Sequence, residues 1–302
     1  MDGIIVVAKP AGPTSHDVVG LIRRLTATRR VGHGGTLDPF ASGVLPVFLG
    51  RATRLVEFHG ASRKCYRATV CLGAVSTTDD LEGEIAVAGG PPIDRAAIER
   101  AILDLRGPIR QQPPAFSAIK VRGRRAYALA RRGERPELPE RDVTIHRLEL
   151  TEWDGSDPDR PIAVVDVECS AGTYVRALAR DLGRAVGSGA YLGALVRTAS
   201  GPFLIEDAVT LDEVRAAVVD DPSGIVRLLR PPDAGLEDLP EVTLDPSSVE
   251  AIVRGRAVAA SEGPRLEGPI RVRDGAGRLI AMALSSDGAL RPTKVLVDVA
   301  GA

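Results

Sequence analysis

Apolar residues along the chain follow two different spacings, and each spacing predicts one kind of element. Residues 3–8 are an uninterrupted, β-branched apolar run that ends before Pro10, which indicates a buried strand. From His16 onward the apolar positions recur at helical intervals, and Thr14 or Ser15 can cap the helix that begins there. The N-terminal part of the chain therefore reads as a strand followed by an amphipathic helix.

The same two patterns continue through the first two-thirds of the chain. Residues 64–73 show partial alternation with β-branched and aromatic positions, and 142–153 and 161–170 form two further strand patterns joined by a polar turn. Together these two segments predict a hairpin. A polar loop is expected over residues 75–84. Helical patterns are predicted over residues 50–55, 94–105, 124–132, 174–186 and 207–230.

The character of the sequence changes after residue 202. Two consecutive prolines at 231–232 are followed by a run of acidic residues, which is typical of a linker. Residues 241–302 contain one helical pattern, at about 246–254, and several short strand patterns around glycine-rich turns. We therefore predict a small β-rich unit of about sixty residues at the end of the chain.

The charge of the chain is unevenly distributed. The 302 residues carry a net charge of −1, but residues 203–302 hold 11 basic and 17 acidic side chains, while residues 1–202 hold 28 and 23. Residues 120–147 alone carry 9 basic and 4 acidic side chains. A polyanion would therefore meet the first two-thirds of the chain. The basic segment at about 106–135 lies between two β regions and predicts an arm that grips an anionic ligand.

The remaining composition indicates a cytoplasmic protein. The longest apolar runs are too short to cross a membrane, and the first residues lack the pattern of a signal peptide. The three cysteines, Cys65, Cys71 and Cys169, are odd in number and lack the spacing of a metal knuckle or a disulfide framework. We interpret them as small buried apolar residues.

Residues 32–46 are the most irregular stretch of the chain. Four glycines and two prolines fall within these fifteen positions, which indicates a shaped loop. Asp38 lies in its middle and is followed by Pro39, which stiffens the backbone and removes one hydrogen-bond donor. A stiffened carboxylate of this kind suits a catalytic or binding group. The local composition fits a tight turn with a solvated aspartate equally well.

The motifs of several enzyme classes are missing from the sequence. The four histidines are dispersed and no cysteine pair has ligand spacing, so we expect no zinc site. No glycine-rich phosphate loop and no nucleophile elbow occur. Asp38 could be the covalent nucleophile of an aspartyl-phosphate enzyme, although Pro39 and Phe40 follow it where a second acid is usual. A lone aspartate beside a basic surface favours metal-free chemistry on a nucleotide.

The stretch 32–46 reads Gly-His-Gly-Gly-Thr-Leu-Asp-Pro-Phe-Ala-Ser-Gly-Val-Leu-Pro and resembles the central motif of the TruB-type tRNA pseudouridine synthases. The resemblance spans roughly residues 3–201, and one position departs from it, because the family usually has Thr or Ser where this chain has Gly34. Its other matching segments are Lys9-Pro10, Lys64 with Tyr66, Thr77 with Asp79 and Gly83, Pro113-Pro114 with Phe116, Ser117, Ala118 and Lys120, and Gly172-Thr173-Tyr174-Val175-Arg176.

The resemblance implies an activity and a role for each matching residue. Asp38 would be the catalytic carboxylate that isomerises uridine-55 in the T-loop of tRNA after the base is flipped out, by attacking the sugar, attacking the base or removing a ribose proton. Tyr66 would stack on the base, and Arg176 would keep Asp38 ionised and oriented. The remaining implied site residues are Leu195 in the base pocket, Lys9 as a support of the site and His33 against the RNA loop.

Each of these residues also has an ordinary structural interpretation, and only their joint pattern favours a site. Tyr66 and Leu195 fit a protein core, Arg176 fits a helix cap, and His33 fits a loop. The resemblance implies no cofactor and no metal. Lysine-rich tails and docking extensions, which a guide-RNA-dependent relative would be expected to carry, are not seen in the sequence.

We therefore predict an α+β fold with a mixed, largely antiparallel sheet flanked by helices, and a small C-terminal β-rich, PUA-like domain. The catalytic domain would comprise residues 1–235, and the C-terminal domain residues 240–302. The expected partner is the T-arm of tRNA, bound by a monomer without a guide RNA. A non-catalytic tRNA-binding or tRNA-folding protein on the same scaffold is the alternative function, and the intact Asp38 speaks against it.

Overall fold

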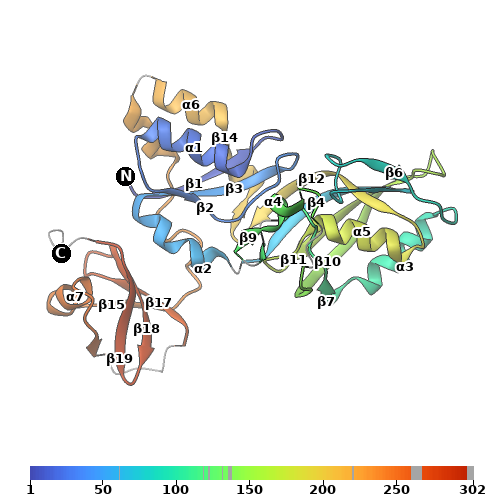
Figure 1. Ribbon diagram of the computed structural model, residues 1–302. Coiled ribbons are helices and arrows are strands. Elements are labelled where there is room, and N and C mark those ends of the chain that lie inside the picture. Colours follow the sequence, from blue (N-terminus) through green and yellow to red (C-terminus); the bar gives the residue numbers. More distant parts are fainter. Residues whose placement is uncertain are drawn as a thin grey trace.

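A single mixed sheet organises the first two-thirds of the chain (Figure 1). The computed structural model describes residues 1–302 apart from 61, 118, 122, 131, 135–137, 220, 260–266 and 298–302, and apart from the side chains of 120, 125, 128 and 222. The strands follow the order β14 (Val209–Thr210), β1 (Gly3–Lys9), β3 (Ser42–Leu49), β12 (Ala190–Ser200), β4 (Lys64–Leu72), β11 (Ile162–Cys169), β10 (Arg141–Asp154) and β7 (Gly107–Gln111).

The pairing of these strands confirms the predicted mixed, largely antiparallel sheet. Among the described pairs, β1–β14 and β3–β12 are parallel, and the others are antiparallel. The short strands β2 (Val31–His33) and β13 (Phe203–Leu204) pair with β3 and β12. The strand β12, for which the sequence pattern gave no element, lies at the centre of the sheet.

Helices cover the two halves of the sheet separately. Over the β1–β3 half lie α1 (Ser15–Thr26), α6 (Leu211–Val219) and the 3₁₀ helix η3 (Pro222–Leu228), which share one apolar core with these strands. Over the other half lie α3 (Arg95–Asp104) and α5 (Val175–Ala185), which share a second core with β4, β10, β11 and β12. The pair of strands β3 and β12 therefore lies where the two halves of the sheet meet (Figure 1).

The junction of β3 and β12 depends on one glycine. Val196 and Arg197 of β12 pair in parallel with Ser42 and Gly43 of β3. Gly43 has a φ of 110°, and a Cβ atom there would lie 2.2 Å from the carbonyl oxygen of Arg197. Only glycine fits this position without a shift of backbone. Residues 42–46, predicted as loop, are therefore strand, and the irregular part of the stretch is 34–41.

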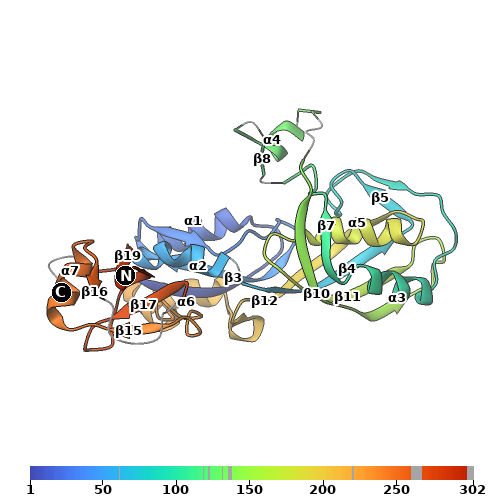
Figure 2. The ribbon, with the colours of Figure 1, turned by 90° about the horizontal axis from the view of Figure 1, so that it is seen from below.

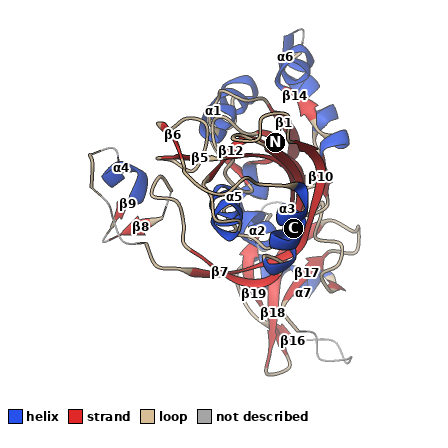
Figure 3. Cartoon of the chain, turned by 90° about the vertical axis from the view of Figure 1, so that its right-hand side faces the viewer, coloured by secondary structure: helices blue, strands red, loops and turns tan. Residues whose placement is uncertain are grey.

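An arm leaves the sheet between β7 and β10 and projects away from the body of the domain (Figures 2 and 3). It contains β8 (Lys120–Val121), β9 (Arg124–Arg125) and the short helix α4 (Ala126–Ala130). The basic helix predicted over 124–132 is therefore shorter, because its first two residues pair with β8 instead. Gln111 and Arg141, the residues at which the arm leaves and rejoins the sheet, pair directly.

Two other predicted elements differ from the structure. The helical pattern over 207–230 is interrupted: Thr210 and Glu213 cap α6, and Asp221 caps the separate helix η3, while η2 (Ile205–Asp207) and β14 precede them. The predicted polar loop 75–84 begins within a small hairpin of β5 (Ala74–Ser76) and β6 (Ile85–Val87). Of the three cysteines, Cys169 is buried and the other two are half-buried.

The C-terminal residues form a second, five-stranded sheet, which confirms the predicted β-rich unit. Its order is β15 (Glu241–Thr243), β17 (Pro269–Arg273), β18 (Leu279–Ser286), β19 (Ala289–Val295) and β16 (Val258–Ala259), with α7 (Pro246–Val253) packed on it. This β-rich domain contacts η1 (Gly50–Leu55) and α2 (Val56–Gly60) through a small cluster that includes Leu55, Met282 and Leu296. No helix in the described chain is long and apolar enough to cross a membrane.

Candidate active site

The loop that carries Asp38 is held by hydrogen bonds from side chains of the N-terminal strand and of the helix that follows it. The ammonium of Lys9, at the end of β1, donates to the carbonyls of Pro10 and Pro13 at 2.8 Å and of Pro39 at 3.3 Å. The hydroxyl of Ser15, in the first turn of α1, bonds both backbone groups of Leu37, at 3.0 and 2.8 Å. None of these bonds involves the Asp38 side chain, which is 32% exposed.

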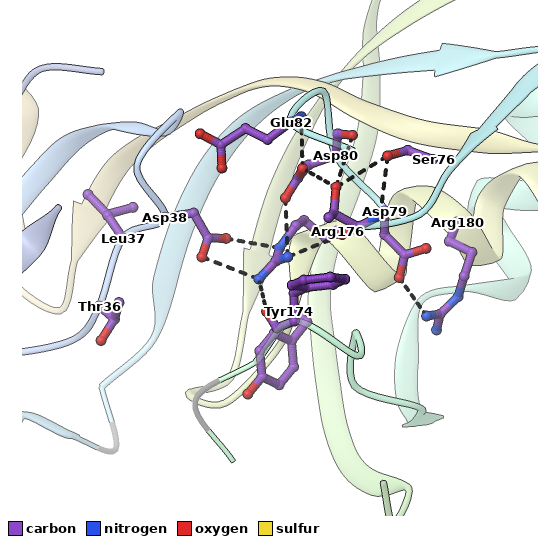
Figure 4. Close-up of polar contacts among 12 residues, drawn as sticks. Thr36, Leu37, Asp38, Ser76, Asp79, Asp80, Glu82, Tyr174, Arg176 and Arg180 are labelled. Atoms are coloured by element: carbon purple, nitrogen blue, oxygen red, sulfur yellow. Dashed lines mark hydrogen bonds and ion pairs between the residues drawn. The ribbon is translucent and has the colours of Figure 1, made fainter. Parts of the chain in front are cut away.

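Arg176, in the first turn of α5, faces Asp38 with its guanidinium (Figure 4). Its Nη2 donates to Oδ1 of Asp38 at 3.3 Å, and its Nε lies 3.0 Å from Oδ2 as an ion pair without an aligned hydrogen bond. The Arg176 side chain is only 6% exposed. A two-pronged pair of this kind fixes the direction of the carboxylate as well as neutralising its charge.

A second carboxylate binds the same guanidinium from the other side. Asp80 is buried and lies 3.1 Å from Nη1 of Arg176, while its Oδ1 accepts hydrogen bonds from the hydroxyl of Thr78 and the amide of Glu82. The carbonyls of Thr78 and Phe116 accept hydrogen bonds from Nη1 and Nη2 of Arg176, at 3.1 and 3.0 Å. Arg176 is thus held by two carboxylates and two carbonyls, which only a guanidinium can satisfy together.

The pKa of Asp38 reflects two opposing effects. Burial raises the pKa of Asp38 above that of an ordinary aspartate, and the carboxylate of Asp80 adds to this increase. The guanidinium of Arg176 and, more weakly, the ammonium of Lys9 lower it. Burial in turn lowers the pKa of Lys9 to about 8, against the attraction of Asp38. Burial is the largest effect on Asp38, and Arg176 opposes it without cancelling it.

A cavity of about 380 Å³ with both apolar and charged lining residues opens beside Asp38. Tyr66 of β4 and Leu195 of β12 both line it, because Tyr66 pairs with Arg197 and Leu195 with Ala68 across the two strands. Side chains two residues apart on a strand share a face. The structure therefore brings together Asp38, Tyr66, Arg176 and Leu195 around one cavity.

Arg197 is a buried residue of this cavity that the sequence analysis did not single out. Its guanidinium donates to the carbonyls of Val44, Gly35 and Thr36 at 2.7, 3.1 and 3.4 Å, and the residue pairs with Tyr66 across β12 and β4. It thereby joins the Asp38 loop to the strands that carry Tyr66 and Leu195. The signal available in the sequence was a charged residue within the mostly apolar segment 190–199, to which the sequence pattern had assigned no element.

His33 lines a second recess, which shares Asp38 with the first cavity. This recess has a volume of about 930 Å³ and is lined also by His16, Glu82 and Tyr127. The Nδ1 atom of His33 accepts a hydrogen bond from the Gly35 amide at 3.3 Å, and burial lowers the pKa of the imidazole. His33 and Tyr66 therefore line different recesses, and Asp38 lines both.

Asp80 is the second site residue that the sequence left unassigned. It lies within the segment 77–83 that carries the family resemblance, but the sequence alone did not show which of its acids faces Arg176. Its neighbour Asp79 adopts a left-handed backbone with a φ of 61° and pairs with Arg180 instead, at 2.8 Å. Among the described residues, no group of three or more His, Cys, Asp or Glu side chains could hold a metal ion.

Family models match almost the entire chain. Residues 23–175 match the N-terminal domain of the TruB family pseudouridylate synthases. Residues 176–237 match the tRNA pseudouridylate synthase B C-terminal domain, and residues 240–296 match the C-terminal region of pseudouridine synthase II TruB. These ranges include Asp38, Tyr66, Arg176 and Leu195.

Individual proteins are similar over a comparable extent. The tRNA pseudouridine synthase B of Thermobifida fusca is 44% identical over 298 residues, which are 97% of this chain and 98% of that protein. The tRNA pseudouridine synthase B of Symbiobacterium thermophilum is 46% identical over 260 residues, 86% of this chain and 84% of that protein. A chain of the Cbf5-Nop10-Gar1 crystal structure superposes with a TM-score of 0.73 at 27% identity, covering 99% of this chain and 86% of that one.

The fold and these matches define an enzyme of the pseudouridine synthase class. The chain belongs to the TruB family of pseudouridylate synthases. The resemblance noted in the sequence is confirmed, and the fold class with it.

Proposed function

We propose that this protein isomerises uridine-55 in the T-loop of tRNA to pseudouridine, with Asp38 as the catalytic carboxylate. The observation that carries the proposal is the position of Asp38 at the edge of a cavity lined by Tyr66 and Leu195, with Arg176 bound to its carboxylate. The similar proteins of Thermobifida fusca and Symbiobacterium thermophilum, which are named tRNA pseudouridine synthase B, support tRNA as the substrate.

The cavity suits a base that has left the RNA stack. Because the target atoms of a stacked uridine are inaccessible, the nucleotide is extruded, at a cost of a few kcal/mol. Inside the cavity the Tyr66 ring offers a stacking surface and Leu195 an apolar wall. Tyr66 pairs across the strands with Arg197, whose guanidinium is bound to the carbonyls of the Asp38 loop.

The reaction breaks the bond between N1 of uracil and C1′ of ribose and forms a bond between C5 and C1′. The proton on C5 is lost and N1 gains one, so no atom is added and no external oxidant or reductant is needed. Asp38 can act by attack on the sugar, attack on the base or removal of a ribose proton. All three routes begin from an ionised carboxylate, which Arg176 favours.

The rest of the chain would bind the RNA and hold the site. We propose a catalytic domain of residues 1–235, with the basic arm at about 106–135 on the T-arm of tRNA, and a C-terminal domain of residues 240–302. The arm projects from the sheet near the mouth of both recesses, since Phe116 and Ser117 line each of them. The protein would act in the cytoplasm as a monomer, without a guide RNA or a cofactor.

The test is incubation of the protein with an unmodified tRNA transcript, followed by chemical mapping of pseudouridine at single-nucleotide resolution. We expect pseudouridine at position 55 and at no other uridine. A transcript with cytidine at position 55 is the matched control and should remain unmodified. Modification at another position would contradict the assigned substrate, and an unmodified wild-type transcript would contradict the activity.

A further inference from the structure

Gln111 is a buried amide that the proposed reaction does not use. It is the last residue of β7, it is 0% exposed, and both ends of its side-chain amide are hydrogen-bonded to the backbone of one residue. Its Nε2 donates to the carbonyl of Tyr174 at 3.0 Å, and its Oε1 accepts from the amide of Tyr174 at 2.8 Å. A fully buried glutamine with both groups satisfied fixes the backbone it binds.

Tyr174 is the residue immediately before α5, the helix that carries Arg176. The Tyr174 side chain makes no capping hydrogen bond, and its carbonyl also accepts the first helical bond, from Leu178 at 3.0 Å. Helix starts without a side-chain cap leave backbone groups that must be held by other means. Here the side chain of Gln111 binds the backbone of Tyr174, which lies two positions before Arg176 in the sequence.

The contact lies at the root of the arm. Gln111 pairs with Arg141 where the arm joins the sheet, and Arg141 itself donates to the carbonyl of Gly172 at 3.3 Å and lies over the Tyr174 ring. Beyond Gln111, the carbonyls of Gln112 and Phe116 accept hydrogen bonds from Arg180 and Arg176, at 2.8 and 3.0 Å. The root of the arm and the start of α5 are therefore one bonded unit.

We infer that Gln111 is a positioning residue of the reaction, which sets the Arg176 guanidinium against Asp38 by fixing the start of α5 to the root of the arm. Because a displacement of about 1 Å at a reacting group can reduce a rate about a hundredfold, a loose helix start would weaken catalysis without removing any group that touches the substrate. This role rests on the proposed function, in which Asp38 is the reacting group.

The effect of Gln111 should be visible in how the single-turnover rate depends on pH. The relevant part is the acid limb, where the rate falls as the pH is lowered. The charged and titratable groups that face Asp38 are Arg176 on α5, Asp80 and Glu82 on the loop after β5, Lys9 on β1 and Tyr66 on β4. Of these, the Gln111 contact acts on the position of Arg176. A weaker Arg176–Asp38 pair stabilises the ionised carboxylate less, so the activity would be lost at a higher pH than in the wild type.

The experiment compares Gln111→Met with Gln112→Met in single-turnover assays on tRNA across pH. Gln112 is exposed and only its backbone carbonyl is used, so its variant is the matched control. We expect Gln111→Met to lower the single-turnover rate by about tenfold to a hundredfold, to shift the acid limb to higher pH and to leave the Kd for tRNA within about twofold. In an Arg176→Lys background, Gln111→Met should add little further loss.

Other results would overturn the inference. The inference is wrong if the rate is unchanged or if the loss of rate is equal at every pH. It is also wrong if the loss adds fully to that of Arg176→Lys, because Gln111 would then have a structural role only. If Met lowers the folded fraction measured by circular dichroism, Gln111→Asn gives the same comparison, because its amide is one methylene too short to bond both groups. The wild type measured alongside separates the outcomes: its failure to modify uridine-55 would refute the proposed function, not this inference alone.

Discussion

Arg176 determines the charge balance at the site because it binds Asp38 and Asp80 at once. Arg176→Lys keeps one positive charge but loses the planar fork that reaches both carboxylates and two carbonyls. Because Arg176 lowers the pKa of Asp38, a weaker pair lets that pKa rise further. We predict a lower single-turnover rate and an acid limb shifted to higher pH, since ionised Asp38 is lost as the pH falls through its pKa.

The control for this prediction is Arg184→Lys. Arg184 lies two turns further along α5 and its side chain is 65% exposed, with Asp181 as its ion-pair partner at 3.6 Å. It should leave both the rate and the acid limb unchanged. A shift of the limb in the Arg184 variant, or an unmoved limb in the Arg176 variant, would contradict this explanation of the Asp38 ionisation.

Gly34, the position at which the sequence departs from the motif that it resembles, lies against the ring of Phe48. A Cβ atom at Gly34 would lie 3.0 Å from Phe48 Cε2, so the fully buried Phe48 ring would have to shift against the core that surrounds it. We predict that Gly34→Ser lowers the free energy of unfolding by about 1–3 kcal/mol, and that Phe48→Leu in the same chain reduces this loss. Gly32→Ser, whose Cβ would meet no atom within 4 Å, is the control. Denaturant unfolding measures all three, and equal losses at Gly34 and Gly32 would contradict the prediction.

At the residue scale, the sequence could indicate Asp38 but not the whole set of its partners. The glycines and proline around Asp38 are local signals, and the family pattern added Tyr66, Arg176 and Leu195. Asp80, Arg197 and Gln111 act through contacts that join distant parts of the chain, as Thr78 and Arg176 do across a separation of 98 positions. No local pattern reports such contacts, because they depend on how the strands are ordered in the sheet.

The arm is the element on which the RNA contacts are expected to depend. Neutralising Arg124, Arg125, Arg131 and Arg132 by Gln should weaken tRNA binding and flatten its dependence on salt, because fewer counterions are released on binding. Of these positions, Arg131 lies outside the described residues, and the side chain of Arg125 is not described. Arg124 pairs with Glu134 at 3.0 Å on the exposed surface.

The matched control for the arm neutralises four exposed arginines of α3, α6 and η3: Arg95, Arg100, Arg215 and Arg227. The same total charge is removed, so a general effect of net charge would appear in both variants. Filter binding at several salt concentrations measures the slope. An unchanged slope in the arm variant, or equal changes in both, would show that the arm does not contact the phosphates.

At the element scale, the accuracy of the sequence predictions followed the strength of the local signals. Thr14 caps α1 as predicted, with a capping box completed by Asp17. The helical pattern over 207–230 failed because the acidic caps at Glu213 and Asp221 start new elements inside an otherwise continuous apolar spacing. The central strand β12 was missed because it is buried among other strands and its pairing partners are far away in sequence.

The whole molecule is held together where the C-terminal domain meets η1 and α2. Arg51 donates to the carbonyl of Leu296 at 3.0 Å, Lys294 pairs with Glu57 at 2.6 Å, and Met282 is fully buried in the cluster between them. We predict that Met282→Lys undocks this domain, because an unpaired ammonium would otherwise be buried in an apolar cluster. Thermal unfolding should then show two transitions in place of one.

The control at this interface is Leu284→Lys, on the same strand but 44% exposed. It should unfold like the wild type. If the Met282 variant also unfolds in one transition at the wild-type temperature, the interface does not couple the two parts. At this scale the sequence predicted a β-rich C-terminal unit after a linker, but not the contacts of Met282 and Leu296, which depend on the packing of both parts.

The proposed reaction depends above all on the carboxylate of Asp38. The most direct measurement is single-turnover pseudouridine formation at position 55 of tRNA by Asp38→Asn, with Asp104→Asn on the exposed face of α3 as the control. Asparagine keeps the size of the side chain but cannot act as a carboxylate. We predict tRNA binding close to that of the wild type and no pseudouridine above background, whereas turnover by Asp38→Asn at the wild-type rate would contradict the account.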